Sequence, residues 1–186
     1  MTEREIWKPL AIGTTATCAV LLILLVLVHP PSSSPVVWSA QERRDLAEVV
    51  SQASLSNGTV APDFSLATTD GDSQCLACRA GQPVALVFVS TSCGYCGELE
   101  RRLAAVDPDR STDILLISSG DLAAAQRLKS DHHVGFPVLV DSARTVSILY
   151  RVSVVPTVYL IDAQGKVQDS AHGLPDSWTM LQRVTG

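Results

Sequence analysis

The stretch that decides the fold is "PVALVFVSTSCGYCGELERRLAAV", residues 83–106. Residues 83–90 form a continuous apolar run, which is typical of a strand that is covered on both faces. The part that follows has Leu99, Leu103 and Val106 at helical spacing. The stretch therefore predicts a buried strand that leads directly into a helix, with the sequence Cys-Gly-Tyr-Cys at the junction.

Strands and helices alternate along the rest of the chain from residue 60 onward. Apolar runs predict strands at 113–118, 136–141 and 157–162, the last of which forms a hairpin with 166–171. Helical patterns cover residues 121–133, 142–150 and 175–184, and Asp121 is a candidate cap for the first of these helices. Residues 60–186 are therefore expected to form one α/β domain with a mixed central sheet.

The N-terminal part predicts a membrane anchor. Residues 10–28 carry no charge, and as a helix they would be about 28 Å long, enough to cross the core of a bilayer. A cleavable signal peptide fits less well, because the apolar run is long and no A-x-A site follows it closely. Arg4 and Lys8 precede the span, so residues 1–9 should be a cytoplasmic tail and the following domain extracytoplasmic. We expect a single-pass protein of the cell membrane.

Residues 29–59 read as an extracytoplasmic linker. It begins with the extended Pro- and Ser-rich stretch 29–35 and continues with a short amphipathic helix within residues 40–55.

The net charge of −5 and the lack of a basic cluster exclude a nucleic-acid-binding protein. His132 and His133 are adjacent on a helix and point about 100° apart, which favours a solvated helix end over a metal site. No metal or other cofactor is expected.

Cys93 and Cys96 are the candidate catalytic residues. Cys93 should lie at the N-terminus of a helix, where exposed N–H groups favour the thiolate form of a cysteine. Cys96, three residues later, is within disulfide reach. In such a pair Cys93 would be the nucleophile and Cys96 the thiol that resolves a mixed disulfide. Structural disulfides and metal sites use the same spacing, so the motif alone does not distinguish a redox-active pair from either of them.

A second pair, Cys75 and Cys78, comes close to completing a zinc-ribbon pattern with the first. A strand of about 20 Å should separate the two pairs, which disfavours one shared zinc ion. A structural disulfide is the favoured interpretation in an oxidising compartment. The alternative is a second redox pair, which would need chain motion or an intermediary to exchange electrons with Cys93 and Cys96.

Four segments together carry a family resemblance, and they are residues 61–66, 84–96, 135–141 and 149–167. With them, residues 60–184 resemble the thioredoxin fold and, within it, the membrane-anchored TlpA/ResA-type thiol:disulfide oxidoreductases, which include a MauD-like subgroup. The resemblance implies that Val155-Pro156 is a cis peptide facing the cysteine pair. It also implies that Val155, Pro156, Gly94 and Tyr95 contact an extended segment of the substrate.

The same resemblance implies an enzyme that acts on protein thiols or disulfides. Its expected role is that of a reductant in the maturation of cytochrome c or other metalloproteins, supplied by a membrane electron-donor protein. The alternative is a thioredoxin-like module that binds copper or zinc through Cys93 and Cys96 without turnover.

The chain departs from the family pattern near the cysteines. Ser92 replaces the usual Trp, and Gly94-Tyr95 replaces a dipeptide that commonly ends in Pro. Several family members carry a Glu three positions after the second cysteine, where this chain has Leu99. Glu98 and Glu100 flank that position and should point about 100° away from it, so we expect both on a solvated helix face.

Overall fold

The computed structural model describes residues 39–108 and 112–185. The predicted tail at 1–9, the predicted membrane helix at 10–28 and the first part of the predicted linker lie outside these residues. Among the helices within 39–108 and 112–185, none is both long and apolar enough to cross a bilayer.

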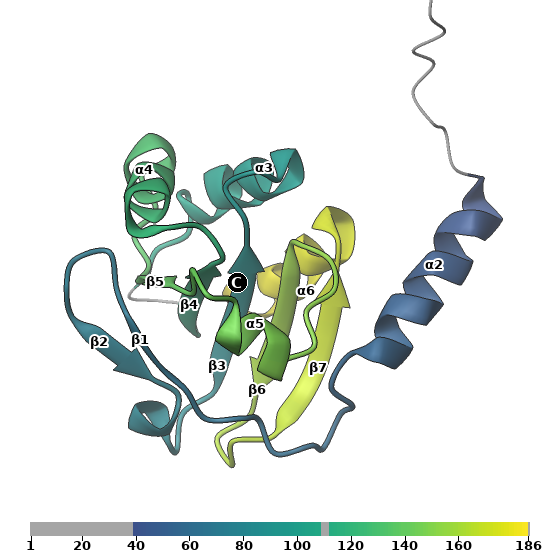
Figure 1. The fold of residues 1–186 in the computed structure, drawn as a ribbon. Coiled ribbons are helices and arrows are strands. Elements are labelled where there is room, and N and C mark those ends of the chain that lie inside the picture. The colour runs from purple at the N-terminus through teal and green to yellow at the C-terminus, as the bar shows by residue number, and fades with distance from the viewer. Residues whose placement is uncertain (1–38, 109–111, 186) are drawn as a thin grey trace, which may run out of the picture. The chain divides into compact units, whose positions relative to one another are not determined.

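A five-stranded mixed sheet forms the centre of the domain (Figure 1). Its strands lie in the order β5 (Val138–Val140), β4 (Asp113–Ser118), β3 (Val84–Val89), β6 (Thr157–Ile161) and β7 (Val167–His172). β3 pairs in parallel with β4, and β4 with β5, whereas β6 runs antiparallel to both β3 and β7. The predicted mixed α/β sheet of a thioredoxin-like fold is confirmed.

β3 is the central strand, and every one of its side chains is at most 1% exposed. Alternate residues contribute to two separate apolar clusters. Ala85, Val87 and Val89 belong to the cluster that includes side chains of α3, α4 and α6, and the other three residues of β3 pack with Val146 and Tyr150 on the opposite face. A continuous apolar run was the right pattern for this strand because both of its faces are covered.

Helices cover both faces of the sheet. In the view of Figure 1, α5 (Thr145–Leu149) lies in front of the sheet and α6 (Leu174–Thr185) behind it. The helices α3 (Gly94–Leu103) and α4 (Leu122–His132) pack against each other. Asp121 caps α4 as predicted, because its Oδ1 accepts a hydrogen bond from the backbone N–H of Ala124 at 2.7 Å.

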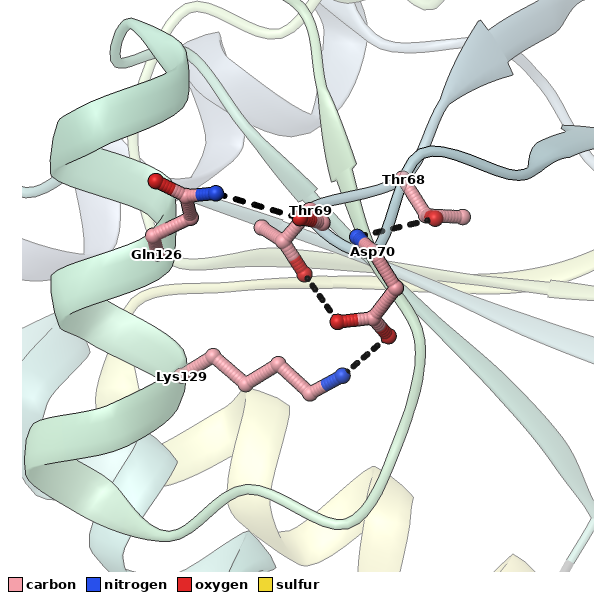
Figure 2. Close-up of polar contacts among 5 residues, drawn as sticks. All are labelled: Thr68, Thr69, Asp70, Gln126 and Lys129. Carbon is pink, nitrogen blue, oxygen red and sulfur yellow. Dashed lines mark hydrogen bonds and ion pairs between the residues drawn. The ribbon is translucent and has the colours of Figure 1, made fainter.

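A hairpin of two short strands lies outside the main sheet. β1 (Ser65–Ala67) pairs antiparallel with β2 (Ser73–Cys75), and a short 3₁₀ helix, η1 (Ala77–Arg79), follows. Figure 2 shows that the turn of this hairpin is tied to α4. Lys129 forms an ion pair with Asp70, and Gln126 Nε2 donates a hydrogen bond to the carbonyl of Thr69 at 3.3 Å.

The chain enters the domain through helix α2 (Ala40–Ala53) and the two buried residues that follow it. The backbone N–H of Leu55 donates to the hydroxyl of Tyr159 at 3.2 Å, and that hydroxyl donates to the carbonyl of Tyr150 at 2.8 Å. Ser54 Oγ lies 3.0 Å from Nε2 of His172 on β7. These contacts attach the end of α2 to the main sheet.

Candidate active site

Cys93 is the N-cap residue of α3, at the point where the chain leaves the end of β3. Its backbone is extended, and its Sγ accepts a hydrogen bond from the backbone N–H of Cys96 at 3.3 Å. Cys93 is half-buried. A sulfur in this position has access to solvent and receives an N–H donor that stabilises its thiolate.

Cys96 lies one turn further into the helix and is fully buried. Burial raises the pKa of its thiol strongly, and the hydrogen bond with Cys93 raises it further. Both cysteines are free thiols in this structure. The pair is therefore asymmetric, with one reachable sulfur and one sheltered thiol that holds its proton.

The loop before β6 lies against Cys93. The Val155-Pro156 peptide bond is cis, and the Cys93 thiol donates to the carbonyl oxygen of Val155 across 3.5 Å. Thr157 Oγ1 donates to the carbonyl of Val154 at 2.8 Å, and the backbone N–H of Gly173 donates to the carbonyl of Pro156 at 2.8 Å. The structure thus places Val155 and Pro156 beside Cys93, where the family resemblance implied a substrate contact.

Gly94 and Tyr95 form the exposed start of α3. The Tyr95 side chain is 71% exposed although it is large and largely apolar. An exposed aromatic ring between the two cysteines offers a contact surface for a partner that approaches Cys93. The role of these residues in substrate binding remains a prediction.

Glu100 does not lie on a solvated face, and that prediction was wrong. Its side chain is 3% exposed and faces the cysteine pair, where its charge contributes to the raised pKa of Cys96. Burial raises the pKa of Glu100 itself to about 7. Within the described part of the chain, its Oε1 has no hydrogen-bond partner. Glu98, by contrast, forms ion pairs with Arg101 and Arg102 on the outer side of the helix.

The sequence contained a sign of this arrangement. Glu100 follows Cys96 by four residues, and side chains four apart lie one above the other on the same face of a helix. The prediction failed because it compared Glu100 with Leu99, the position that aligns with the family glutamate. Because Glu100 follows Cys96 by four residues, this periodicity places the Glu100 side chain on the same face of the helix as the Cys96 thiol.

His132 was also predicted to lie on a solvated helix end, but it is only partly exposed. It lies at the end of α4, with its Nε2 3.3 Å from Oε2 of Glu100, whereas His133 is exposed as predicted. A cavity of about 300 Å³ is lined by Cys93, Gly97, Glu100 and His132 among others.

Cys75 and Cys78 are joined in a disulfide that spans the end of β2 and η1. They precede β3, whereas Cys93 follows it, so the six residues of that strand separate the two pairs by about 20 Å. No group of three His, Cys, Asp or Glu side chains suited to a metal ion occurs in residues 39–108 and 112–185. A metal bound at the site would therefore depend on the thiolates of Cys93 and Cys96 alone.

Comparison with known proteins agrees with this geometry. The AhpC/TSA family model matches residues 57–170, which is more than half of the chain. The methylamine utilization protein MauD of Methylophilus methylotrophus is 32% identical over 112 residues, which cover 59% of this chain and 53% of that protein. The thiol-disulfide oxidoreductase ResA of Bacillus subtilis (strain 168) is 32% identical over 118 residues, which cover 61% of this chain and 66% of that protein. The chain thus spans less than two thirds of either relative.

Solved structures give the same assignment. A Chlorobium tepidum structure described as the thiol:disulfide interchange protein DsbE has 27% sequence identity and a TM-score of 0.62, covering 70% of this chain and 95% of that chain. ResA and the DsbE structure thus both carry names of proteins that exchange thiols and disulfides. The chain belongs to the AhpC/TSA family, and it is similar to ResA and MauD.

Proposed function

We propose that this protein is a thiol:disulfide oxidoreductase that exchanges disulfides with protein clients through Cys93 and Cys96. One observation carries the proposal. A half-buried sulfur at the N-cap of α3 faces the Val155 carbonyl of a cis-proline loop, and a fully buried second thiol lies behind it. An extended client segment that pairs with the backbone of Val155 would bring its disulfide to Cys93.

The reaction proceeds in two exchange steps. The thiolate of Cys93 attacks one sulfur of a client disulfide, which forms a mixed disulfide and releases the other client sulfur as a thiol. Cys96 then loses its proton and attacks Cys93 Sγ. This closes the Cys93–Cys96 disulfide and releases the second client thiol, so the client gains two electrons and the protein loses two.

Glu100 is the group that takes the proton from Cys96 in this scheme. Cys96 needs a nearby base because burial strongly disfavours its thiolate. Glu100 has a pKa of about 7 and one carboxylate oxygen without a hydrogen-bond partner in the described chain, so near neutral pH it can accept a proton. His132 contacts the other oxygen and holds the carboxylate in place.

The proposal extends to location and clients. Residues 10–28 would anchor the protein in the cell membrane with its N-terminus in the cytoplasm and its catalytic domain outside. A membrane electron-donor protein would keep Cys93 and Cys96 reduced, and the clients would be thiols or disulfides of cytochrome c or other metalloproteins during maturation. The names of ResA and DsbE, which refer to thiol-disulfide exchange, support the exchange reaction on which this role depends.

An insulin reduction assay with dithiothreitol tests the activity. We expect turnover by the wild type, none by Cys93→Ser, and full turnover by the matched control Cys75→Ser/Cys78→Ser. In cells, Cys96→Ser should accumulate mixed disulfides with its clients, because the resolving step is blocked. Wild-type protein that is folded and reduced but turns over no insulin, and that purifies with copper or zinc in equal molar amount, would favour the metal-binding alternative.

A further inference from the structure

We propose that the Cys75–Cys78 disulfide is a second thiol–disulfide exchange site, which accepts two electrons from a protein dithiol independently of Cys93 and Cys96. The proposal goes beyond the function assigned above. It rests on the exposure of this disulfide, on the hydrogen bond made by one of its sulfurs, and on the contacts that hold its segment in place without it.

The two sulfurs of the pair differ in access. Cys78 is exposed in the 3₁₀ helix η1, whereas Cys75 at the end of β2 is half-buried. Exchange requires a thiolate to reach one sulfur in line with the bond that breaks. Cys78 is therefore the sulfur that an incoming thiolate attacks.

Cys75 is suited to be the leaving group. The backbone N–H of Cys78 points at Cys75 Sγ with an N···S distance of 3.0 Å. At the first site, the N–H of Cys96 makes the equivalent contact to Cys93 Sγ at 3.3 Å. A donor directed at a sulfur stabilises its thiolate, and a better stabilised thiolate leaves faster in exchange.

A purely structural role explains this disulfide poorly. The stabilisation from a disulfide grows with the length of the loop that it closes, and these cysteines are only three positions apart. The segment is also held by other contacts. The N–H of Ala77 donates to Oδ1 of Asp63 at 2.9 Å, the side chain of Leu76 is buried in the core, and Arg79 forms an ion pair with Asp113.

The hairpin that carries Cys75 is fixed at its other end as well. Its turn is bound to α4 through the Asp70–Lys129 ion pair and the hydrogen bond from Gln126 to the carbonyl of Thr69, as Figure 2 shows. Both ends of the segment therefore keep their contacts when the disulfide opens. The pair can change redox state without loss of the fold.

The exchange transfers two electrons from the donor dithiol to the disulfide in two steps. A thiolate of the donor dithiol attacks Cys78 Sγ, the Cys75–Cys78 bond breaks, and its electron pair leaves on Cys75 as a thiolate. The second thiol of the donor loses its proton and attacks the donor sulfur of the mixed disulfide, which releases Cys78. The donor becomes a disulfide, and Cys75 and Cys78 become two thiols. Cys93 of the same chain is not the donor, because β3 keeps the two sites about 20 Å apart.

The test isolates the second site in the full-length chain. The variant Cys18→Ser/Cys93→Ser/Cys96→Ser retains only Cys75 and Cys78. Dithiothreitol or a reduced thioredoxin is the reductant. The reduction of the disulfide is monitored by alkylating the released thiols and measuring the resulting mass shift. We expect reduction in native buffer at a rate within about tenfold of that in denaturant, because the disulfide is exposed. Native reduction more than about a hundredfold slower would show that the disulfide opens only on unfolding, and would overturn the proposal.

Two further measurements complete the test. A thioredoxin that lacks its own resolving cysteine should form a mixed disulfide at Cys78, as located by peptide mass. Linkage at Cys75 would contradict the order of attack, and no adduct would contradict the site. Replacing Cys75 and Cys78 by Ser in the same variant should abolish the mass shift and keep the circular dichroism spectrum; an unfolded product would show a structural role. Since Cys93 and Cys96 are absent throughout, the result does not depend on the function proposed for them.

Discussion

Replacing Glu100 by Gln should make the protein more stable at alkaline pH. The folded protein holds this carboxyl at a pKa of about 7 against an ordinary value of 4.5, because the group is buried. Between these two pH values the folded state binds more protons than the unfolded state, so the free energy of unfolding falls as the pH rises. At about 1.36 kcal/mol for each pH unit, the buried charge costs about 3 kcal/mol above pH 7, and most of this cost is incurred between pH 5 and pH 8.

Chemical denaturation of the reduced wild type and of Glu100→Gln at pH 5 and pH 8 measures this effect. The wild type should lose about 2–3 kcal/mol more than the variant between the two pH values. Glu98→Gln is the matched control, since it removes a glutamate of the same helix that is paired with Arg101 and Arg102 on the outer side. Its pH dependence should follow that of the wild type. If Glu100→Gln loses as much stability as the wild type, the carboxyl is not held protonated by burial and the proton transfer from Cys96 has no basis.

Three other predictions concern a buried histidine, a buried hydroxyl group and the packing of the core. Burial lowers the pKa of His172, so the unfolded chain binds more protons than the folded protein in mildly acidic solution. The free energy of unfolding should therefore fall as the pH drops through about 6.5. In urea titrations, His172→Gln should lose less stability than the wild type between pH 7 and pH 5. Tyr159→Phe removes a hydroxyl with two buried hydrogen bonds, and a fall in unfolding free energy of about 1–3 kcal/mol is expected by denaturation. Leu103→Ala should lower the free energy of unfolding by about 2–5 kcal/mol, because the Leu103 side chain is fully buried. Leu122 is half-exposed, so the control Leu122→Ala should change it by about 0.5 kcal/mol or less. Equal effects of the two substitutions would contradict the packing.

Most of the sheet and its helices could be predicted from the sequence because their patterns are local. The apolar run of β3 identified a strand buried on both faces, and Asp121 identified the start of α4. The strand β2 and the helix η1 were not predicted. Residues 73–75 are polar or small, and their strand exists only through the pairing of Ser73 and Cys75 with β1, a contact that no periodicity reveals.

The candidate site was predicted in part. The strand-to-helix junction placed Cys93 and Cys96, and the family resemblance implied the cis peptide at Pro156, which the structure shows. The burial of Glu100 and its contact with His132 were missed because they depend on the packing of α3 against α4, a tertiary contact that local patterns do not reveal. The membrane anchor at residues 10–28 remains a prediction, since it lies outside the described residues.

The central claim is that Cys93 is the reachable nucleophile and Cys96 the sheltered thiol. Timed alkylation of the fully reduced full-length protein with iodoacetamide at pH 7, followed by peptide mass mapping, tests it most directly. The structure predicts that Cys93 is modified at least about tenfold faster than Cys96, because Cys93 has solvent access and an N–H donor while Cys96 is buried. Equal rates, or faster modification of Cys96, would contradict the claim.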